Sequence, residues 1–318
     1  MLEAILLIIV GFALLMMGAD LLVKGSSNIA KRFHIPEMII GVTIVALGTS
    51  MPELMITISS ANKGASDLII GNAIGSNLCN LLLILGLTAV LRPVKLERDV
   101  KILHLPVAYI STLAIFAMGS GLFGSKLGII DSRDGKILVG LYFLYFLYPI
   151  LIEIKDIWKN RKERMNETHI KVLPSLIYII MGAILLKIGG DITVDEASVL
   201  AEIFGISQRI IGLTIVAIGT ALPELITSII AVVKDDEGLA VGNLIGSCIL
   251  NSFLILGTGA IITPLTFSIE FVENIILLLI TILFIWISCL IGKKDTITRY
   301  KAGVLLIMYV IYMVQLFK

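Results

Sequence analysis

The sequence predicts an all-α integral membrane protein of about ten transmembrane helices, arranged as two inverted five-helix repeats. Three observations lead to this fold class. Hydrophobic residues make up 58% of the 318 residues and charged residues only 15%, whereas a soluble domain is about one quarter charged. The apolar residues form runs of about twenty, the length that crosses the hydrocarbon core of a bilayer. A helix-breaking acidic motif occurs once in each half of the chain.

The apolar runs account for the predicted transmembrane helices. The longest polar stretch, Lys155–Lys171, divides the runs equally, and Asp191–Gln208 is interpreted as an amphipathic continuation of the sixth helix. The predicted helices cover residues 3–28, 36–61, 67–91, 102–120, 128–154, 172–190, 208–233, 238–263, 268–292 and 298–317.

These runs divide the chain into a first five-helix repeat, residues 1–154, a loop, residues 155–171, and a second five-helix repeat, residues 172–318. Most lysine and arginine residues of the connections fall on one side of the predicted helices, together with the central loop. The positive-inside rule assigns that side to the cytoplasm. The chain is therefore expected in the cell (plasma) membrane, multi-pass, with both termini extracellular.

The two halves share one sequence pattern without a gap. GVTIVALGTSMPEL begins at Gly41 and GLTIVAIGTALPEL at Gly212, an offset of 171 residues (212 minus 41). The same offset places GNAIGSNLCN, from Gly71, on GNLIGSCILN, from Gly242. Because each half has an odd number of helices, the second half must enter the membrane from the opposite side. The pattern favours the inverted-repeat plan of secondary transporters over a duplicated bundle without a transport role.

Glu53 and Glu224 lie near the middle of apolar runs, at equivalent positions of the repeat. An ionised carboxylate at that depth costs about 3 kcal/mol or more unless a partner compensates it. A structural hydrogen bond to a neighbouring helix is an adequate explanation for one such glutamate. Two glutamates in the same repeated motif favour a cation-binding site.

Each half supplies further oxygen atoms near its glutamate. Thr49 and Thr220 each precede a glutamate by four residues, which puts both side chains on one helix face. Hydroxyl, amide and carboxylate oxygens suit hard cations such as Ca²⁺ and Na⁺. The next helix of each half repeats the spacing with serine and asparagine, in the pairs Ser76 with Asn80 and Ser247 with Asn251.

Pro52 and Pro223 directly precede the two glutamates. Proline lacks an N–H group and clashes with the carbonyl four residues back, so each helix should bend there. Backbone carbonyls near Ala46 and Ala217 are then expected to lose their partners and to serve as further cation ligands. A kink that serves packing alone is the alternative.

The second motif of each half contains glycine and asparagine. The glycines are spaced by four residues, which lets helices approach closely, and this packing role is favoured over contact with an ion. Asn72 and Asn243 are expected to support the site through hydrogen bonds. The glycines are Gly71, Gly75, Gly242 and Gly246.

GTSMPE with GNAIGSN, and GTALPE with GNLIGSC, resemble the two alpha repeats of the calcium/cation antiporter superfamily. Within it, the chain is most similar to prokaryotic members of the sodium/calcium exchanger family. The resemblance implies exchange of Ca²⁺ against several Na⁺ at overlapping mid-membrane sites, with sliding of the first and sixth helices to alternate access. It implies that the metal ligands are the carbonyls of Ala46 and Ala217 and the side chains of Thr49, Ser50, Glu53, Ser76, Asn80, Thr220, Glu224, Ser247 and Asn251.

Two positions depart from the family pattern. Ala221 stands where the first half has Ser50, so one hydroxyl ligand is lost and one sodium position is expected to be altered. Asn251 occupies a position that is Asp in several prokaryotic exchangers and in potassium-dependent relatives. This difference favours exchange without potassium.

The nearest alternative function is a Ca²⁺/H⁺ antiporter with Glu53 and Glu224 as proton carriers. The hydroxyl-rich GTSMPE favours Na⁺, because hydroxyls coordinate Na⁺ but do not carry protons near neutral pH. A cation channel would commonly place its ligands around an oligomer axis, whereas both ligand sets here lie in one chain. The chain is expected not to be an enzyme, since the sequence shows no nucleophile–base arrangement.

The expected partners are the transported ions Ca²⁺ and Na⁺ and the lipid bilayer, and a monomer is expected. A net charge of +1 does not indicate binding to nucleic acid. No cofactor is expected. The three cysteines, Cys79, Cys248 and Cys289, lie in apolar runs without metal-binding or redox spacing and are interpreted as packing residues.

Overall fold

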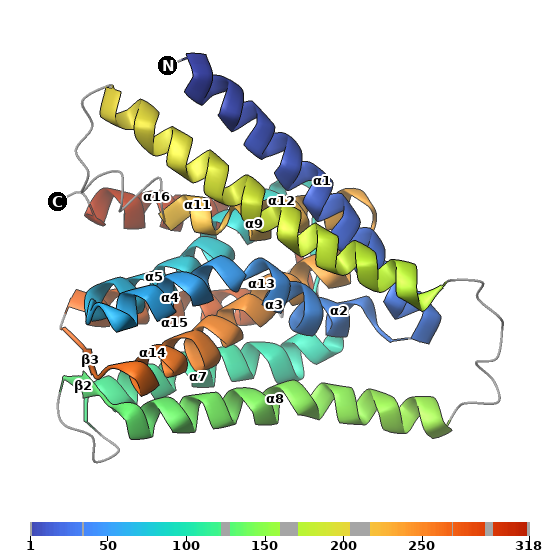
Figure 1. Cartoon of the computed structure of the whole chain (residues 1–318). Helices are drawn as coiled ribbons and strands as arrows, with labels where there is room; N and C mark the ends of the chain where they lie inside the picture. Colours follow the sequence, from blue (N-terminus) through green and yellow to red (C-terminus); the bar gives the residue numbers. More distant parts are fainter. Residues whose placement is uncertain are drawn as a thin grey trace. The chain divides into compact units, whose positions relative to one another are not determined.

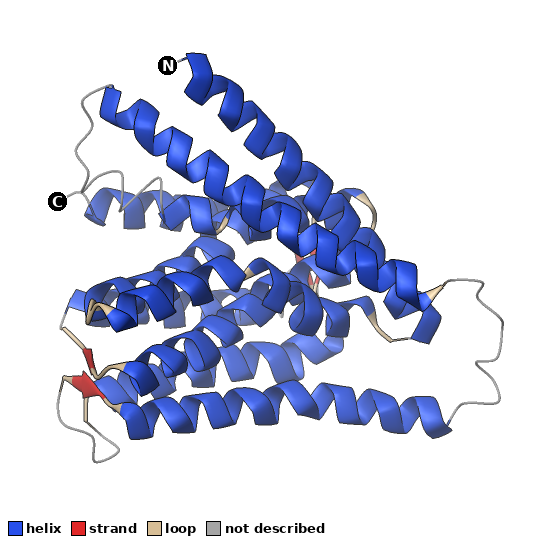
Figure 2. Ribbon diagram, in the orientation of Figure 1, coloured by secondary structure: helices blue, strands red, loops and turns tan. Residues whose placement is uncertain are grey.

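A computed structural model describes residues 2–33, 35–121, 128–159, 171–203, 217–268, 270–289 and 295–316, which are almost entirely helical (Figure 2). The bent pair Glu37–Thr49 and Met51–Asn62 forms one apolar segment. By length and composition, six further helical segments are able to cross a membrane: Leu2–Phe33, Ser66–Leu91, Val100–Gly119, Val172–Thr193, Glu237–Ile262 and Phe271–Ser288. The prediction of an all-α membrane protein is confirmed at this level.

The chain forms two compact units, and each unit contains residues of both predicted repeats. The first unit comprises Met1–Pro52 and Pro149–Asn243, and the second comprises Glu53–Tyr148 and Leu244–Lys318. The proposed boundaries at residues 1–154, 155–171 and 172–318 describe sequence halves and stay a prediction.

The first unit is built on two long helices, α1 (Leu2–Phe33) and α9 (Val172–Ile203), which lie side by side (Figure 1). The length of α9 confirms that the sixth helix continues past residue 190, as far as Ile203. The predicted start of the seventh helix, residue 208, lies outside the described residues. The unit also contains α2 (Glu37–Ile40), the π-helix η1 (Gly41–Val45), α3 (Ala46–Thr49), α11 (Ala217–Thr220), α12 (Leu222–Val233) and α13 (Glu237–Leu250) as far as Asn243; the rest of α13 belongs to the second unit.

Glycines bring α1 and α9 into close contact. A Cβ atom placed on Gly18 would lie 2.8 Å from the carbonyl oxygen of Gly182, and one on Gly11 would lie 3.0 Å from that of Gly189. Because the partners follow in opposite order along the two helices, α1 and α9 are antiparallel. Gly182 and Gly189 are the repeat equivalents of Gly11 and Gly18, so each helix contributes the same small residues to the interface.

The second unit contains most of the remaining elements. Its first segment holds α4 (Met51–Asn62, from Glu53), α5 (Ser66–Leu78), η2 (Cys79–Ile84), α6 (Leu85–Leu91), β1 (Val94–Lys95), η3 (Val100–His104), α7 (Leu105–Gly119), β2 (Ile129–Ile130) and α8 (Ser132–Lys159, to Tyr148). Its second segment holds η5 (Asn251–Ile255), α14 (Leu256–Ile262), β3 (Leu265–Thr266), α15 (Glu270–Ser288), β4 (Thr296–Ile297) and α16 (Arg299–Leu316).

The repeat is visible in the backbone where α6 and α14 end. Arg92 and Thr263, which are equivalent, are both extended, with φ −143°. Each donates its N–H to the carbonyl four residues earlier at 3.0 Å. Pro93 and Pro264 follow, and the residue before a proline is disfavoured in the α conformation. One local sequence signal therefore ends both helices at the same place.

Two short antiparallel pairs of strands were not predicted. β1 pairs with β4, and β2 pairs with β3, so each pair joins the two sequence halves inside the second unit. Two-residue strands carry no alternating pattern that a sequence analysis can detect. The fifth helix therefore begins at Ser132 and not at residue 128.

The central loop is shorter at its start than predicted. α8 continues to Lys159, so residues 155–159 are helical. Residues 160–170 lie outside the described part of the chain.

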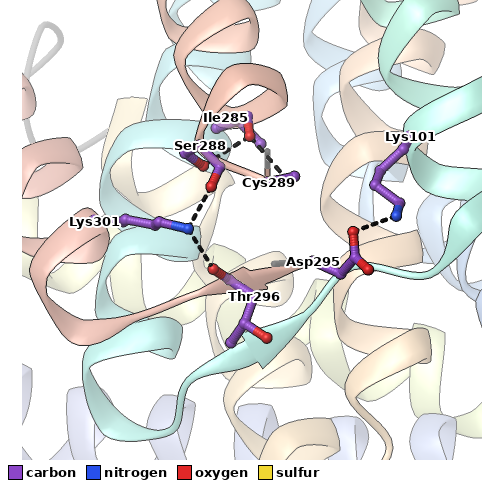
Figure 3. Close-up of polar contacts among 7 residues, drawn as sticks. All are labelled: Lys101, Ile285, Ser288, Cys289, Asp295, Thr296 and Lys301. Carbon is purple, nitrogen blue, oxygen red and sulfur yellow. Dashed lines mark hydrogen bonds and ion pairs between the residues drawn. The ribbon is translucent and has the colours of Figure 1, made fainter. Parts of the chain in front are cut away.

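Two lysine side chains contact residues at the end of α15 and at the start of β4 (Figure 3). The Lys301 ammonium donates to the carbonyl of Thr296 at 2.9 Å and to that of Ser288. The carboxylate of Asp295 pairs with Lys101, which lies in η3. These contacts tie the short strand β4 to two helices and stabilise its pairing with β1.

Candidate cation-binding site

The first repeated motif bends its helix at Ser50. α3 ends at Thr49 and α4 begins at Met51, and the axes on either side of this break differ by 47°. Pro52 lies in the first turn of α4, where a missing N–H is tolerated. The predicted bend is therefore confirmed, and the second motif breaks in the same place, at Ala221 between α11 and α12.

The expected loss of backbone hydrogen bonds near Ala46 does not extend to Ala46 itself. The carbonyl of Ala46 has not lost its partner, because it accepts the N–H of Ser50 at 3.0 Å. The proline removes the donor to Gly48, four residues before it, and leaves the previous turn intact. A carbonyl oxygen has a second lone pair, so Ala46 stays a predicted ligand. In the other half the N–H of Ala221 donates to Ile218 at 3.1 Å.

The first unit places Ser50 against Glu224. The Ser50 hydroxyl donates to Oε1 of Glu224 at 2.9 Å, and both residues are buried, with 1% of their surface exposed. A carboxylate in such surroundings requires compensation by hydrogen bonds and by positive charge. Two of the predicted ligands are thus brought into direct contact.

Asn243 links a further predicted ligand to α12. Thr49 donates its hydroxyl to Oδ1 of Asn243 at 3.0 Å, and Nδ2 of Asn243 donates to Ser228 at 3.2 Å. The three side chains are fully buried. The hydrogen bonds expected of Asn243 are present, and its role in supporting a cation site stays a prediction. Because the hydroxyl hydrogen of Thr49 is engaged, the lone pairs of its oxygen remain available as acceptors. Thr220 is buried in the same unit.

The second unit contains Glu53, which is 1% exposed. Nδ2 of Asn72, on α5, donates to the backbone carbonyl of Glu53 at 3.2 Å and so ties α5 to α4. The expected hydrogen bond of Asn72 is therefore present, although it is made to the main chain, and its role in supporting a cation site stays a prediction.

Two serines and two asparagines of the second motifs are buried in the second unit. They are Ser76, Asn80, Ser247 and Asn251. The π-helix η2 begins at Cys79, next to Asn80, and η5 begins at Asn251, so an irregular helix occurs at the same point of both halves. Such π-helical segments are frequent at functional sites.

Asn77 is a buried, hydrogen-bonded polar residue that the sequence analysis did not single out. It lies on α5, is 1% exposed, and forms hydrogen bonds with Cys248, Asn251 and Ser252. A detectable signal existed: the repeated motif reads GSN in the first half and GSC in the second, so Asn77 and Cys248 mark a break in the symmetry.

The predicted ligands therefore fall into two buried groups. Thr49, Ser50, Thr220 and Glu224 belong to the first unit, and Glu53 belongs to the second with the four serines and asparagines. The meeting of Glu53 and Glu224 at one site stays a prediction.

The expected close packing of the motif glycines holds at one position and not at another. A Cβ atom on Gly242 would lie 2.4 Å from the carbonyl oxygen of Met38, so close approach is confirmed there. At Gly75 no atom of the described residues lies within 4 Å of such a Cβ, so that glycine does not have the predicted packing role.

Comparison with known proteins gives concordant results. The family profile described as "Sodium/calcium exchanger protein" matches residues 3–151 and 174–318. The chain is 32% identical to the putative antiporter CaxA of Alkalimonas amylolytica, over 100% of this chain and 99% of that protein. It is 31% identical to the sodium/calcium exchanger MaX1 of Methanosarcina acetivorans, over 98% of each.

A solved structure is similar over the same length. A structure of the sodium-calcium exchanger NCX_Mj, soaked with Na⁺ and Sr²⁺, has a TM-score of 0.83 and 29% sequence identity to this chain. The similarity covers 98% of both chains.

Proposed function

The chain belongs to the sodium/calcium exchanger family, and we propose that it exchanges Ca²⁺ for Na⁺ across the cell membrane by alternating access. Membership confirms the resemblance carried by the repeated motifs. It supports calcium/cation antiport as the general activity, and the family is one of exchangers, not of enzymes.

One observation carries the assignment: both glutamates of the repeated motif are buried, each with 1% of its surface exposed. Together they give the proposed site a charge of −2, which one Ca²⁺ or two Na⁺ would neutralise. An unbalanced charge is costly where the dielectric constant is low, so the empty site should resist the change of access. Because of this cost, the protein should exchange one ion for another and should not let ions leak through. This requires that each ion binds more tightly to the conformations in which it neutralises the site.

The proposed arrangement is ten helices in two inverted repeats. The antiparallel packing of α1 on α9, through equivalent glycines, supports it, as do the equivalent ends of α6 and α14. The proposed ligands are the eleven residues predicted from the motifs: Ala46, Thr49, Ser50, Glu53, Ser76, Asn80, Ala217, Thr220, Glu224, Ser247 and Asn251.

Sodium is the proposed coupling ion, and the proton is the alternative. The buried hydroxyls of Thr49, Ser50 and Ser247 favour sodium, because a hydroxyl is a neutral oxygen ligand that does not ionise near neutral pH. The glutamates alone would serve either ion.

Calcium flux into proteoliposomes decides between the coupling ions. Gradients of Na⁺, H⁺ and K⁺ are imposed in turn on vesicles that contain the purified chain. We expect an outward Na⁺ gradient to drive Ca²⁺ uptake and the other two to leave it unchanged. Uptake driven by the pH gradient alone would establish the proton-coupled alternative, and large unitary currents would indicate a channel.

The proposed location is the plasma membrane with both termini outside. The excess of Lys and Arg on the side of the central loop supports it. A protease-cleavable tag at either terminus should be removed from intact cells, and protection of both tags would reverse the orientation.

A further inference from the structure

Asn77 connects two helices of the second unit through its side-chain amide. Its Nδ2 donates to the backbone carbonyl of Cys248 at 3.2 Å and to the hydroxyl of Ser252 at 2.9 Å. Its Oδ1 accepts a hydrogen bond from Nδ2 of Asn251 at 3.1 Å. All four residues are at least 98% buried.

These contacts determine which way both amides face. The carbonyl of Cys248 can only accept a hydrogen bond, so the NH₂ group of Asn77 must point towards it. The oxygen of Asn77 then points towards Asn251 and can itself only accept. Asn251 must therefore present its NH₂ group to Asn77, and its oxygen faces away from that contact.

The oxygen of Asn251 is buried and has no hydrogen-bond partner among the described residues. Leaving such an acceptor unsatisfied in a protein interior is costly. In a native structure such an acceptor is usually completed by an ordered water, a ligand or an ion. An amide oxygen of fixed direction is a suitable ligand for a hard cation.

The equivalent position in the other half lacks this arrangement of hydrogen bonds. The repeat partner of Asn77 is Cys248, whose thiol is a weak donor and lies 3.8 Å from the carbonyl oxygen of Asn77. The repeat partner of Asn251 is Asn80, and neither its oxygen nor its nitrogen has a partner among the described residues. The structure thus orients one of the two amides and leaves the other to adapt.

We propose that Asn77 is a positioning residue, which orients the amide of Asn251 so that its oxygen faces the transported cation. This inference rests on the proposed function of the site, because it assumes that Asn251 is a cation ligand. Asn77 touches the ligand and not the ion. Its contribution is to exclude the flipped amide, which would turn an NH₂ group towards the ion.

Equilibrium Ca²⁺ binding to the purified protein tests the proposal without requiring exchange. Asn77→Leu keeps a similar volume and removes both hydrogen-bonding groups. We expect it to weaken Ca²⁺ binding by roughly 10- to 100-fold, as loss of a hydrogen bond to a metal ligand typically does. In flux measurements the Ca²⁺ concentration for half-maximal rate should rise while the maximal rate is retained.

Ile74→Val is the matched control. Ile74 lies one turn before Asn77 on α5 and is 2% exposed, so this change perturbs packing alone. It should lower the thermal stability slightly and leave Ca²⁺ affinity within about twofold of the wild type. Equal losses of affinity in Asn77→Leu and Ile74→Val would overturn the proposal.

A double-mutant cycle separates positioning from a purely structural effect. If Asn77 acts through Asn251, then Asn77→Leu should have little further effect on Ca²⁺ affinity in protein that carries Asn251→Ala. Full additivity of the two losses would overturn the proposal. Should Asn77→Leu fail to fold, Asn77→Ser, which also removes the amide, is measured in the same cycle with the same two outcomes.

The same measurements distinguish failure of this inference from failure of the proposed function. A wild-type protein that binds Ca²⁺ but does not exchange it for Na⁺ refutes the proposed exchange. The double-mutant cycle on Ca²⁺ affinity then still tests the role of Asn77. Normal exchange by wild type together with unchanged binding by Asn77→Leu refutes only the role of Asn77. A wild type that binds no Ca²⁺ refutes both.

Discussion

The two copies of the acidic motif differ in their hydrogen bonds although their sequences nearly coincide. In the first copy the hydroxyl of Ser50 donates to Glu224. Ala221, at the equivalent position, has no hydroxyl, and its N–H donates three residues back where that of Ser50 donates four residues back. The repeat thus preserves the position of the carboxylates and varies the neutral oxygens around them. Equal charge and unequal neutral oxygens would suit the proposed site, which holds different ions in turn.

The same contrast appears at two equivalent aspartates, Asp20 on α1 and Asp191 on α9. Asp20 pairs with Lys234, on the turn after α12, with 2.5 Å between the charged atoms. Its repeat equivalent, Asp191, pairs with Lys187 on its own helix at 2.6 Å. The first ion pair therefore links two elements of the first unit, and the second lies within a single helix.

The largest expected effect tests whether the two motifs are equal in charge. Glu53→Gln and Glu224→Gln each leave the site with a charge of −1, which cannot neutralise Ca²⁺. We expect each to reduce Ca²⁺ exchange in proteoliposomes by roughly a hundredfold or more, as the loss of about 3 kcal/mol implies. Size-exclusion profiles should remain those of folded protein. Normal exchange in either variant would refute the role assigned to that glutamate.

The next effect concerns packing of the glycine motifs. Gly242→Ala places a methyl group against the carbonyl of Met38, and we expect it to destabilise the protein by about 1–3 kcal/mol. Gly75→Ala occupies open space among the described residues and should be tolerated, since alanine also favours a helix. Thermal unfolding in detergent measures both. Equal midpoints would contradict the difference in packing.

A smaller effect tests the neutral oxygens. Ser50→Ala removes the hydroxyl that contacts Glu224, and we expect the Na⁺ concentration for half-maximal exchange to rise several-fold, roughly the 1 kcal/mol of a net hydrogen bond. The opposite change, Ala221→Ser, adds a hydroxyl in the second motif. It should lower the Na⁺ concentration for half-maximal exchange or leave that concentration unchanged. If Ser50→Ala left Na⁺ dependence intact, the asymmetry would have no role in sodium binding.

The smallest effect concerns the two aspartate pairs. Both pairs are largely exposed to solvent, and exposed ion pairs contribute about 0.2–1 kcal/mol. Asp20→Asn and Asp191→Asn should therefore change the unfolding midpoint by no more than a few degrees. Because the pair of Asp20 joins separate elements, Asp20→Asn should have the larger effect of the two. The reverse order would contradict the structural difference between them.

Local signals predicted much of the architecture. Apolar runs located the helices, because a segment without polar groups must bury its backbone hydrogen bonds in a helix when it lies in lipid. Prolines located the breaks at Ser50 and Ala221. The chemistry-bearing residues, Glu53 and Glu224 above all, are recognisable from their type and position in the chain, because a carboxylate in an apolar run is costly wherever its partners lie.

The tertiary structure alone decided which of these residues touch. Ser50 and Glu224 are 174 positions apart, and Asn77 and Asn251 are also 174 apart, so no spacing within a helix brings them together. The role of Asn77 depends on an acceptor supplied by the backbone of another helix, which its own sequence surroundings do not contain. The strand pairs of β1 with β4 and of β2 with β3 likewise arise only when distant loops meet.

The sequence by itself determined the helices, their breaks and the charge of the proposed site, since these follow from each residue's own chemistry. The direction in which an amide or hydroxyl faces was decided by packing, since it depends on the partner opposite.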